Sequence, residues 1–220
     1  MKNFQNLLKL LTWNSQSYPI GSYSFSSGLE YAVESSIITS GKKLQTWLKE
    51  LLIFGNLQSD SILLIETWKL MNENKNHIIP DLNIFAISLN QSYEKYLESY
   101  EQGKAFIKIS GEAWNHKFSS HNLVFPIAYA SSAYQENISL KDTLISYLHA
   151  NLSNLLAAGI KLIPLGQTEG QKIQISLNTF IENEYKNILK KDINNIGNCA
   201  WVNDIISMKH ENQFTRIFRT

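Results

Sequence analysis

The chain has 220 residues and is poor in arginine, cysteine and long apolar runs. Its only arginines, Arg216 and Arg219, lie close to the C-terminal end, so a forked guanidinium contact with a carboxylate or phosphate can be made only there. The single cysteine, Cys199, excludes an intramolecular disulfide and favours a cytoplasmic setting. No run of about 20 apolar residues is present, which predicts no membrane span. The N-terminal residues are too polar for a signal peptide.

Charge and composition also exclude several function classes. The formal net charge is +1, so nothing in the overall balance indicates a nucleic-acid partner. Hydrophobic residues make up 44% of the chain, which is sufficient for a real core, and the length fits one domain over residues 1–220. The sequence has no glycine-rich phosphate loop and no Ser-His-Asp context. We therefore expect no catalytic residues, no bound cofactor and no intrinsic GTP hydrolysis.

Apolar residues recur at helical spacing through most of the chain, and strand-like alternation is short and rare. This periodicity predicts an all-α, single-domain bundle of roughly eight to ten helices, followed by a docking tail over residues 211–220. Pro126 suits the first turn of a helix, and Ser139 suits an N-cap. The expected helices cover residues 3–13, 27–36, 42–56, 60–74, 82–89, 93–110, 125–134, 139–163, 167–191 and 200–211.

Residues 18–30 form the first unusual loop, which Pro19 and Gly21 turn. Its closely spaced hydroxyl and aromatic side chains are Tyr23, Ser24, Phe25, Ser26 and Ser27. The serines can cap the next helix, and Glu30 near its N-terminus interacts favourably with the helix dipole. Glu34 lies one turn later, so both carboxylates share a face. Two carboxylates on one face can bind a metal or act in acid–base catalysis, although surface helices show such pairs constantly.

Residues 157–171 form the second unusual loop, in which Pro164 bends or ends a long helix. Lys161 lies between apolar neighbours, so its ammonium must reach water or a carboxylate, for which Glu30 is one candidate. Two stripes with a spacing of four follow. They are Gly166 with Gly170, a small-residue stripe, and Gln167 with Gln171, an amide stripe that could satisfy buried polar groups.

The last residues, 207–220, interleave apolar and charged side chains. Aromatic residues and arginine contribute most to binding energy at protein interfaces. We therefore expect this segment to dock, either on its own chain or on another protein. Its side chains of interest are His210, Glu211, Phe214, Arg216, Ile217, Phe218 and Arg219.

The histidines offer weak metal-site signals. His116 and His121 are five residues apart, whereas histidine ligands on a helix prefer spacings of three or four. His210 and Glu211 near Cys199 could bind a transition-metal ion in principle, because imidazole and thiolate are suitable ligands. A small, semi-buried role for Cys199 is the simpler interpretation, and His149 suits a core or interface. We expect no metal site.

The two loops and the tail, in this order, resemble the urease accessory protein UreF family. The matching segments are residues 19–30, residues 98–103, residues 157–171 and residues 207–220. The resemblance implies an all-helical protein that dimerises, is not an enzyme, and joins UreD (also called UreH) and the GTPase UreG to deliver nickel into apo-urease. The partner-binding residues that we infer from the loops, the tail and this resemblance are Tyr23, Ser24, Ser26, Glu30, Lys161, Gln167, Gln171, His210, Glu211, Phe214, Arg216, Ile217, Phe218 and Arg219. Lys161 departs from the arginine often found in the family.

Three functions remain open from the sequence. The leading hypothesis is a non-catalytic scaffold for nickel delivery, whose tail docks on UreD. The alternative is a regulator of UreG turnover that supplies Arg216 or Arg219 in trans. An enzyme that uses Glu30 and Glu34 is the third. A weakly binding polar path for hydrated nickel is a further possibility, lined by Ser24, Ser26, Glu30, Gln167 and Gln171.

Overall fold

A computed structural model describes residues 2–197 and 199–220. These residues form α-helices and short 3-10 turns, with no strand among them, which confirms the predicted all-α, single-domain fold. The α-helices are α1 (Lys2–Trp13), α2 (Leu29–Glu34), α3 (Gly41–Ile53), α4 (Asn56–Asn72), α5 (Ile79–Ser88), α6 (Tyr93–Trp114), α7 (Phe125–Gln135), α8 (Leu140–Leu162), α9 (Gln167–Ile188) and α10 (Trp201–His210). The 3-10 turns are η1 (Ser22–Ser24), η2 (Asn76–Ile78) and η3 (Ile193–Asn195). Within the described residues no helix has the length and apolar character needed to cross a membrane.

Local sequence signals explain where several helices begin. The side chains of Ser40, Ser92 and Ser139 each accept a hydrogen bond from a main-chain N–H in the first turn of α3, α6 and α8. Such caps satisfy donors that a helix N-terminus otherwise leaves unpaired. Pro126 lies in the first turn of α7, where it needs no amide hydrogen. The expected cap at Ser139 and the expected start of α7 are confirmed.

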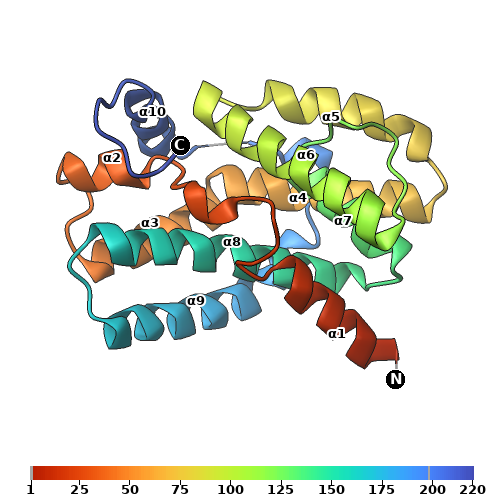
Figure 1. Ribbon diagram of the computed structural model, residues 1–220, viewed down its shortest axis with the longest axis horizontal. Coiled ribbons are helices and arrows are strands. Elements are labelled where there is room, and N and C mark those ends of the chain that lie inside the picture. The colour runs from red at the N-terminus through yellow and green to blue at the C-terminus, as the bar shows by residue number, and fades with distance from the viewer. Residues whose placement is uncertain (1, 198) are drawn as a thin grey trace.

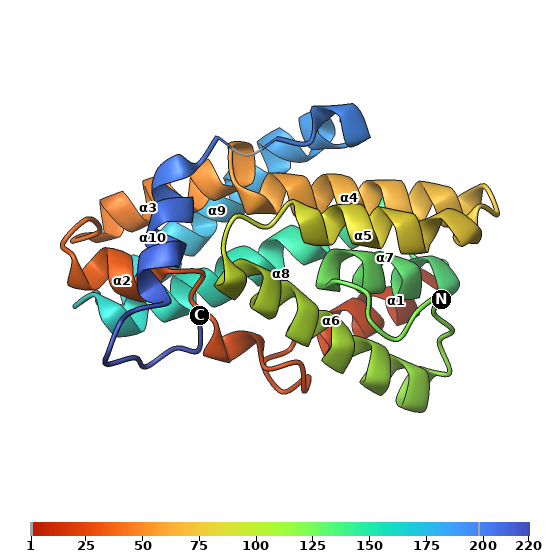
Figure 2. The same ribbon diagram turned by 90° about the horizontal axis from the view of Figure 1, so that it is seen from above.

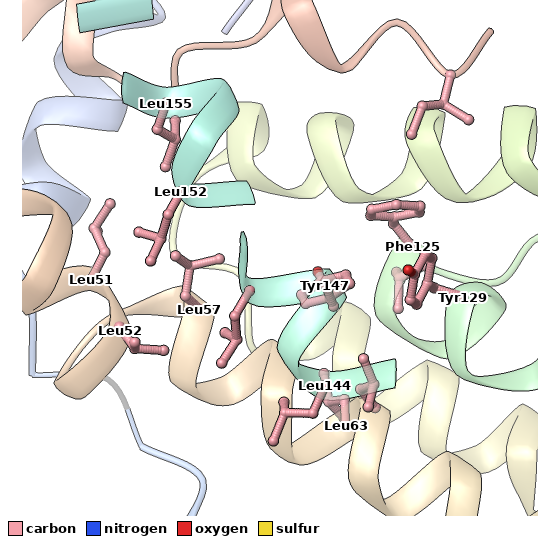
Figure 3. Packing of buried hydrophobic residues seen from close by; sticks show 14 of the residues in the cluster. Leu51, Leu52, Leu57, Leu63, Phe125, Tyr129, Leu144, Tyr147, Leu152 and Leu155 are labelled. Atoms are coloured by element: carbon pink, nitrogen blue, oxygen red, sulfur yellow. The ribbon is translucent and has the colours of Figure 1, made fainter. Parts of the chain in front are cut away.

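One continuous apolar core joins the long helices (Figure 3). Leu57 and Leu63 of α4 face Leu144 and Leu152 of α8, and rings from α7 and α8 extend the same layer. Gly159 lets α8 approach α3 closely, because a Cβ there would lie 2.5 Å from a methyl group of Leu44. This frame fixes the helices on which the C-terminal segment lies.

The C-terminal segment returns to the beginning of the chain (Figures 1 and 2). Helix α10 crosses α2 at one end of the molecule, and the residues after it loop back alongside the segment that leads into α2. Gly28 has φ +82°, a left-handed conformation, and a Cβ there would lie 3.0–3.1 Å from atoms of Ile206 and Ser207. Glycine at this position therefore permits both the turn into α2 and the close approach of α10.

Most expected helices are present, with shifted ends. Helix α4 starts at Asn56 instead of residue 60, and α6 continues to Trp114 instead of residue 110. The expected helix over residues 27–36 is shorter, because Ser27 and Gly28 both have positive φ and α2 starts only at Leu29. These differences arise at helix ends, where side-chain periodicity carries the least information.

Candidate partner-binding site

Glu30 holds the main chain of the C-terminal tail, residues 211–220. The side chain of Glu30 is buried in the first turn of α2. Its two carboxylate oxygens accept hydrogen bonds from the main-chain N–H groups of Ile217, at 2.7 Å, and Phe218, at 2.9 Å. A carboxylate that accepts from main-chain amides makes a strong, charge-assisted contact. The first loop and the tail, far apart in sequence, are thus joined at one buried residue.

The first loop also pairs with the end of the chain. The main-chain N–H and the hydroxyl of Ser26 both donate to the main-chain oxygen of Thr220, each at 2.7 Å. The N–H of Arg219 donates to the carbonyl oxygen of Ser24 at 2.8 Å. Ser26 and Thr220 have no exposed surface. The serines that the sequence singled out therefore satisfy the main chain of the tail.

His210 lies between two buried glutamates. Its imidazole has no exposed surface; Nδ1 lies 2.8 Å from Oε2 of Glu94, and Nε2 lies 3.4 Å from Oε2 of Glu30. Burial opposes the charged imidazolium, but the hydrogen bonds and charges of Glu94 and Glu30 outweigh it and raise the pKa of His210. The guanidinium of Arg216 reaches the same Glu94 at 3.0 Å. His210 thus links α10 to α2 and α6.

Helices α6 and α10 share a second polar contact. The ammonium of Lys95 is buried and forms an ion pair with Asp204, and it donates to Oδ1 of Asn203 at 2.7 Å. Sequence reasoning missed Glu94 and Lys95, and assigned no role to Glu98. The spacing of Glu94 and Glu98 could have pointed to this part of α6. The two residues are four apart on a helix, so their carboxylates share a face.

The tail divides into a buried side and an exposed side. The ring of Phe218 is 5% exposed, whereas Phe214 is fully exposed and Ile217 is 77% exposed. Phe218, expected from the sequence to act as a docking anchor, packs here on its own chain, because Glu30 holds its main chain and its ring joins the core.

Side chains near the tail differ from the expected pairs. Lys161 is exposed, and its ammonium lies 5.9 Å from the centre of the Phe218 ring, a cation–π arrangement. It forms no ion pair with Glu30 in the described structure, where the Glu30 oxygens are occupied by the tail.

Two other expected partner-binding residues lie at the edges of this region. The carboxylate of Glu211 accepts from the N–H of Tyr93 at the start of α6, at 2.9 Å. Tyr23 is exposed at the edge of the same loop.

Helix α10 presents an apolar outer face beside this tail. Trp201, Val202, Ile205 and Met208 are exposed, while Ile206, Ser207 and His210 point inward. A groove of about 700 Å³ lies between the N-terminal part of α10 and α3, and its lining includes Trp47, Phe54 and Trp201. The helix was predicted from the sequence, but its apolar outer face was not. The spacing of the four apolar residues does place them on one face of a helix. Exposed apolar patches of this kind mark interaction surfaces.

The second loop does not join this site as a polar path. Gln167 and Gln171 are exposed in the first turns of α9, whereas Ser26 and Glu30 are buried under the tail. Gly170, but not Gly166, makes a close approach, because a Cβ there would lie 2.5 Å from Ile160. The expected path through Ser24, Ser26, Glu30, Gln167 and Gln171 is thus not assembled in this conformation.

A small polar cavity lies behind the tail instead. It has a volume of about 50 Å³, and Ser27, Asp60, Lys95 and Glu98 are among its lining residues. A polar cavity of that volume is large enough to hold water. Burial raises the pKa of Asp60 to about 7 and that of Glu98 to about 7. Glu98 also accepts from Ser27 at 2.8 Å and from the Thr220 hydroxyl at 3.4 Å, so the cavity wall contacts the end of the tail.

The structure also places the other three histidines considered from the sequence. His116 is buried and contacts Ser132 at 2.9 Å and Glu136 at 2.8 Å, while His121 is exposed. His149 is exposed on α8. No group of three or more His, Cys, Asp or Glu side chains suited to a metal ion occurs in the described part of the chain.

Comparison with known proteins gives a consistent result. Residues 38–178 match the family model UreF. The chain is 32% identical to the urease accessory protein UreF of Rhodopseudomonas palustris (strain HaA2), over 98% of this chain and 94% of the relative. It is 33% identical to UreF of Bradyrhizobium diazoefficiens, over 97% of this chain and 91% of the relative. It is 32% identical to UreF of Granulibacter bethesdensis, over 97% and 94%.

Proposed function

Because the chain belongs to the UreF family of urease accessory proteins and therefore takes part in urease maturation, we propose that it acts there as a non-catalytic docking scaffold. In this proposal it assembles in the cytoplasm with UreD (UreH) and the GTPase UreG to deliver nickel into apo-urease. The observation that carries the proposal is the exposed apolar surface at the C-terminal end of the chain. It comprises Trp201, Val202, Ile205, Met208, Phe214 and Ile217, and is called the C-terminal ridge below.

The ridge supports docking for a physical reason. Its side chains are large and apolar, yet the main chain beneath them is fixed by buried contacts of Glu30 and His210. A surface that is already ordered loses little conformational entropy when a partner covers it. UreD is the partner that we assign to the ridge, and UreG meets the polar surface formed by Tyr23, Lys161, Gln167 and Gln171.

A non-catalytic role is supported by the contacts of the two carboxylates considered for an enzyme. Glu30 is committed to the tail, and exposed Glu34 forms a hydrogen bond with the side chain of Gln213. Neither of them is left to act on a substrate in this conformation. Glu30 and Glu34 are therefore assigned to holding the tail.

The direct test measures capture of UreD by the purified chain. The double variant Phe214→Ala/Ile217→Ala removes two ridge side chains that make no buried contact, so the fold should persist. Loss of two interface anchors should weaken UreD binding roughly 30-fold or more. Ile84→Ala/Ile175→Ala is the matched control, because both side chains are exposed on α5 and α9. Unchanged UreD affinity in the ridge variant would refute the proposed docking surface.

Removal of residues 211–220 is a less specific test. It would also take away Phe218, Arg216 and the main-chain donors to Glu30, so the buried carboxylates of Glu30 and Glu94 would lose donors and keep only part of their contacts, those with His210 among them. Loss of UreD binding by the truncated protein must therefore be read together with its thermal unfolding. Full UreD binding by a folded truncated protein would contradict the proposal.

A second candidate function is regulation of UreG turnover by an arginine supplied in trans. Arg219 favours it, because its side chain is exposed near the ring of Phe25, at 5.9 Å, while Arg216 pairs with Glu94. Arg219→Lys should then lower UreG turnover strongly without loss of UreG binding. If Arg219→Lys instead abolishes UreG binding, the role of Arg219 is explained by docking alone and the regulatory function is not supported.

A further inference from the structure

A groove of about 840 Å³ lies between the second half of α6 and the segment that follows this helix, residues 115–122. It is called the α6 groove below. Its lining includes the apolar side chains of Ala105, Ile107 and Phe118, of which Ile107 is buried and the other two are half-buried. The groove therefore has an apolar floor, which a ligand with apolar side chains can cover.

The walls of the α6 groove are cationic. Lys104 and Lys108 come from α6. Lys117 and His121 come from the facing segment, and all four side chains are exposed. None of the three lysines forms an ion pair in the part of the chain that the structure describes. Positive charge on both walls of a groove attracts and orients an acidic ligand.

The facing segment is held in place by its own contacts. Asn115 reverses the chain after α6 in a left-handed conformation, with φ +58°. The imidazole of buried His116 contacts the carboxylate of Glu136 at 2.8 Å. The main-chain N–H and carbonyl oxygen of Lys117 both form hydrogen bonds with the side-chain amide of Gln135. Because this wall is already ordered, a ligand in the groove loses little binding energy to the ordering of a loop.

Two carboxylates limit the length of the cationic region. Glu101 and Glu112 also line the groove, and they are the first and last α6 residues in its wall. Eleven helical steps separate them, a span of roughly 16 Å. About five residues of extended chain cover that span. Acidic groups beyond it would meet Glu101 or Glu112, so the wall favours a short acidic stretch over a long one.

We propose that the α6 groove binds a short acidic segment of a partner protein, in which carboxylates alternate with apolar side chains. Alternate side chains of an extended chain point to opposite faces and recur about every 6.6 Å. Lys104 and Lys108 are one helical turn apart, with Cβ atoms about 5–6 Å apart, so their flexible side chains match that repeat. The apolar side chains of the segment cover Ile107 and Phe118, and its carboxylates reach the lysines.

The same features favour a peptide over other anionic ligands. The continuous phosphate backbone of a nucleic acid would meet Glu101 and Glu112 at the two ends, and the formal net charge of the whole chain is only +1. An anionic membrane presents a flat surface to a protein. The lysines here line a groove with an apolar floor, which a side chain fills and a headgroup layer does not.

The α6 groove is separate from the C-terminal ridge. The last turns of α6 and helix α10 lie at opposite ends of the molecule (Figures 1 and 2). No residue of the ridge lines the α6 groove. The inference therefore does not rest on the proposed docking function, and one chain can hold an acidic segment in the groove while its ridge is covered.

The test measures binding of a fluorescein-labelled peptide to the purified full chain by fluorescence anisotropy. The probe has about eight residues, in which glutamates alternate with leucines. It should bind saturably, and the variant Lys104→Glu/Lys108→Glu should weaken binding at least roughly tenfold. Lys186→Glu/Lys190→Glu is the matched control, because it reverses two exposed lysines that are also four residues apart and lie outside the groove. Circular dichroism and thermal unfolding verify that both variants are folded.

A reciprocal exchange of charge makes the test specific. A peptide with lysines in place of the glutamates should bind the Lys104→Glu/Lys108→Glu variant more tightly than it binds wild type. A peptide with serines in place of the leucines should bind wild type roughly tenfold more weakly than the probe, because it cannot cover the apolar floor. Hydrogen exchange should show slower exchange of amides in residues 115–122 when the probe is bound.

Several results would overturn the proposal. They are no saturable binding of the glutamate–leucine peptide, unchanged affinity in Lys104→Glu/Lys108→Glu, and an equal loss in Lys186→Glu/Lys190→Glu. Sedimentation of wild type with phosphatidylserine vesicles, lost in Lys104→Glu/Lys108→Glu and without any peptide binding, would assign the lysines to lipid and would also overturn it.

UreD capture separates this inference from the proposed function. The Phe214→Ala/Ile217→Ala variant should bind the glutamate–leucine peptide as tightly as wild type. If no form of the chain binds UreD, the docking function fails while the peptide measurement still decides the α6 groove. If wild type binds UreD but not the peptide, the groove proposal fails and docking stands.

Discussion

The carboxylate of Glu30 accepts the main-chain N–H of Phe218 at 2.9 Å, and this contact joins residues 188 positions apart in the chain. The same carboxylate accepts from Ile217 and lies 3.4 Å from His210. Together with the contacts of Ser24 and Ser26, this buried side chain fixes which residues of the tail point inward. Phe218 enters the core, and the two side chains at positions 214 and 217 are exposed to solvent.

Glu30→Gln should loosen the tail without unfolding the helical body. A glutamine has one acceptor oxygen in place of two, so a buried main-chain N–H faces an amide NH₂ group, at a cost of about 1–3 kcal/mol. Hydrogen exchange of the Ile217 and Phe218 amides should accelerate roughly 10- to 100-fold. Glu112→Gln, at an exposed position of α6, should leave these amides unchanged. Equal protection in Glu30→Gln and wild type would show that Glu30 does not hold the tail.

The contribution of His210 to stability should decline as pH rises. Glu94 and Glu30 raise its pKa in the folded protein above the ordinary value of 6.5. The folded state therefore binds this proton more tightly than the unfolded state. The stabilisation is fully present below pH 6.5 and is lost as the pH rises through the raised folded pKa. Denaturant unfolding of wild type and His210→Gln between about pH 5.5 and 9 measures it. The difference in unfolding free energy should be largest at the acidic end, and a difference that grows with pH would contradict this account.

Glu98→Gln should become more favourable relative to wild type as pH rises. Burial raises the pKa of Glu98 from 4.5 to about 7, so the folded state retains a proton that the unfolded state releases, and wild-type stability falls between these values. Glutamine does not titrate and still offers an oxygen to Ser27 and Thr220. The relative gain between about pH 5 and pH 8 should be about 1–3 kcal/mol. Glu112→Gln should show no such trend by the same unfolding measurement.

Gly28→Ala should destabilise the junction of α2 and α10. The residue has φ +82°, and a Cβ there would lie 3.0–3.1 Å from Ile206 and Ser207. Strained backbone and a forced shift of α10 should together cost about 1–3 kcal/mol of unfolding free energy. Gly166→Ala is the matched control, because φ is −70° there and an added methyl group would meet no atom within 4 Å. Thermal unfolding compares the two, and equal midpoints would rule out the close approach as the reason for glycine at 28.

Most of the fold could be predicted from the sequence, because apolar residues at helical spacing specify helices locally. The candidate site was predictable only in part. Loop residues 24–30 and tail residues 210–219 were selected from composition and from the family resemblance, and the structure brings Ser24, Ser26 and Glu30 together with the tail. The exposed glutamines at 167 and 171 were selected as well, yet they lie apart from these buried contacts.

The sequence by itself determined that this protein is helical, that its two arginines lie at its end, and that this end carries side chains suited to an interface. Only the tertiary structure decided which of those side chains face the core and which are exposed to solvent. The physical reason is that a buried carboxylate needs donors, and the donors of Glu30 and Glu94 come from segments more than a hundred residues away. No local pattern encodes such a pairing, because it exists only once α2, α6 and α10 have packed together.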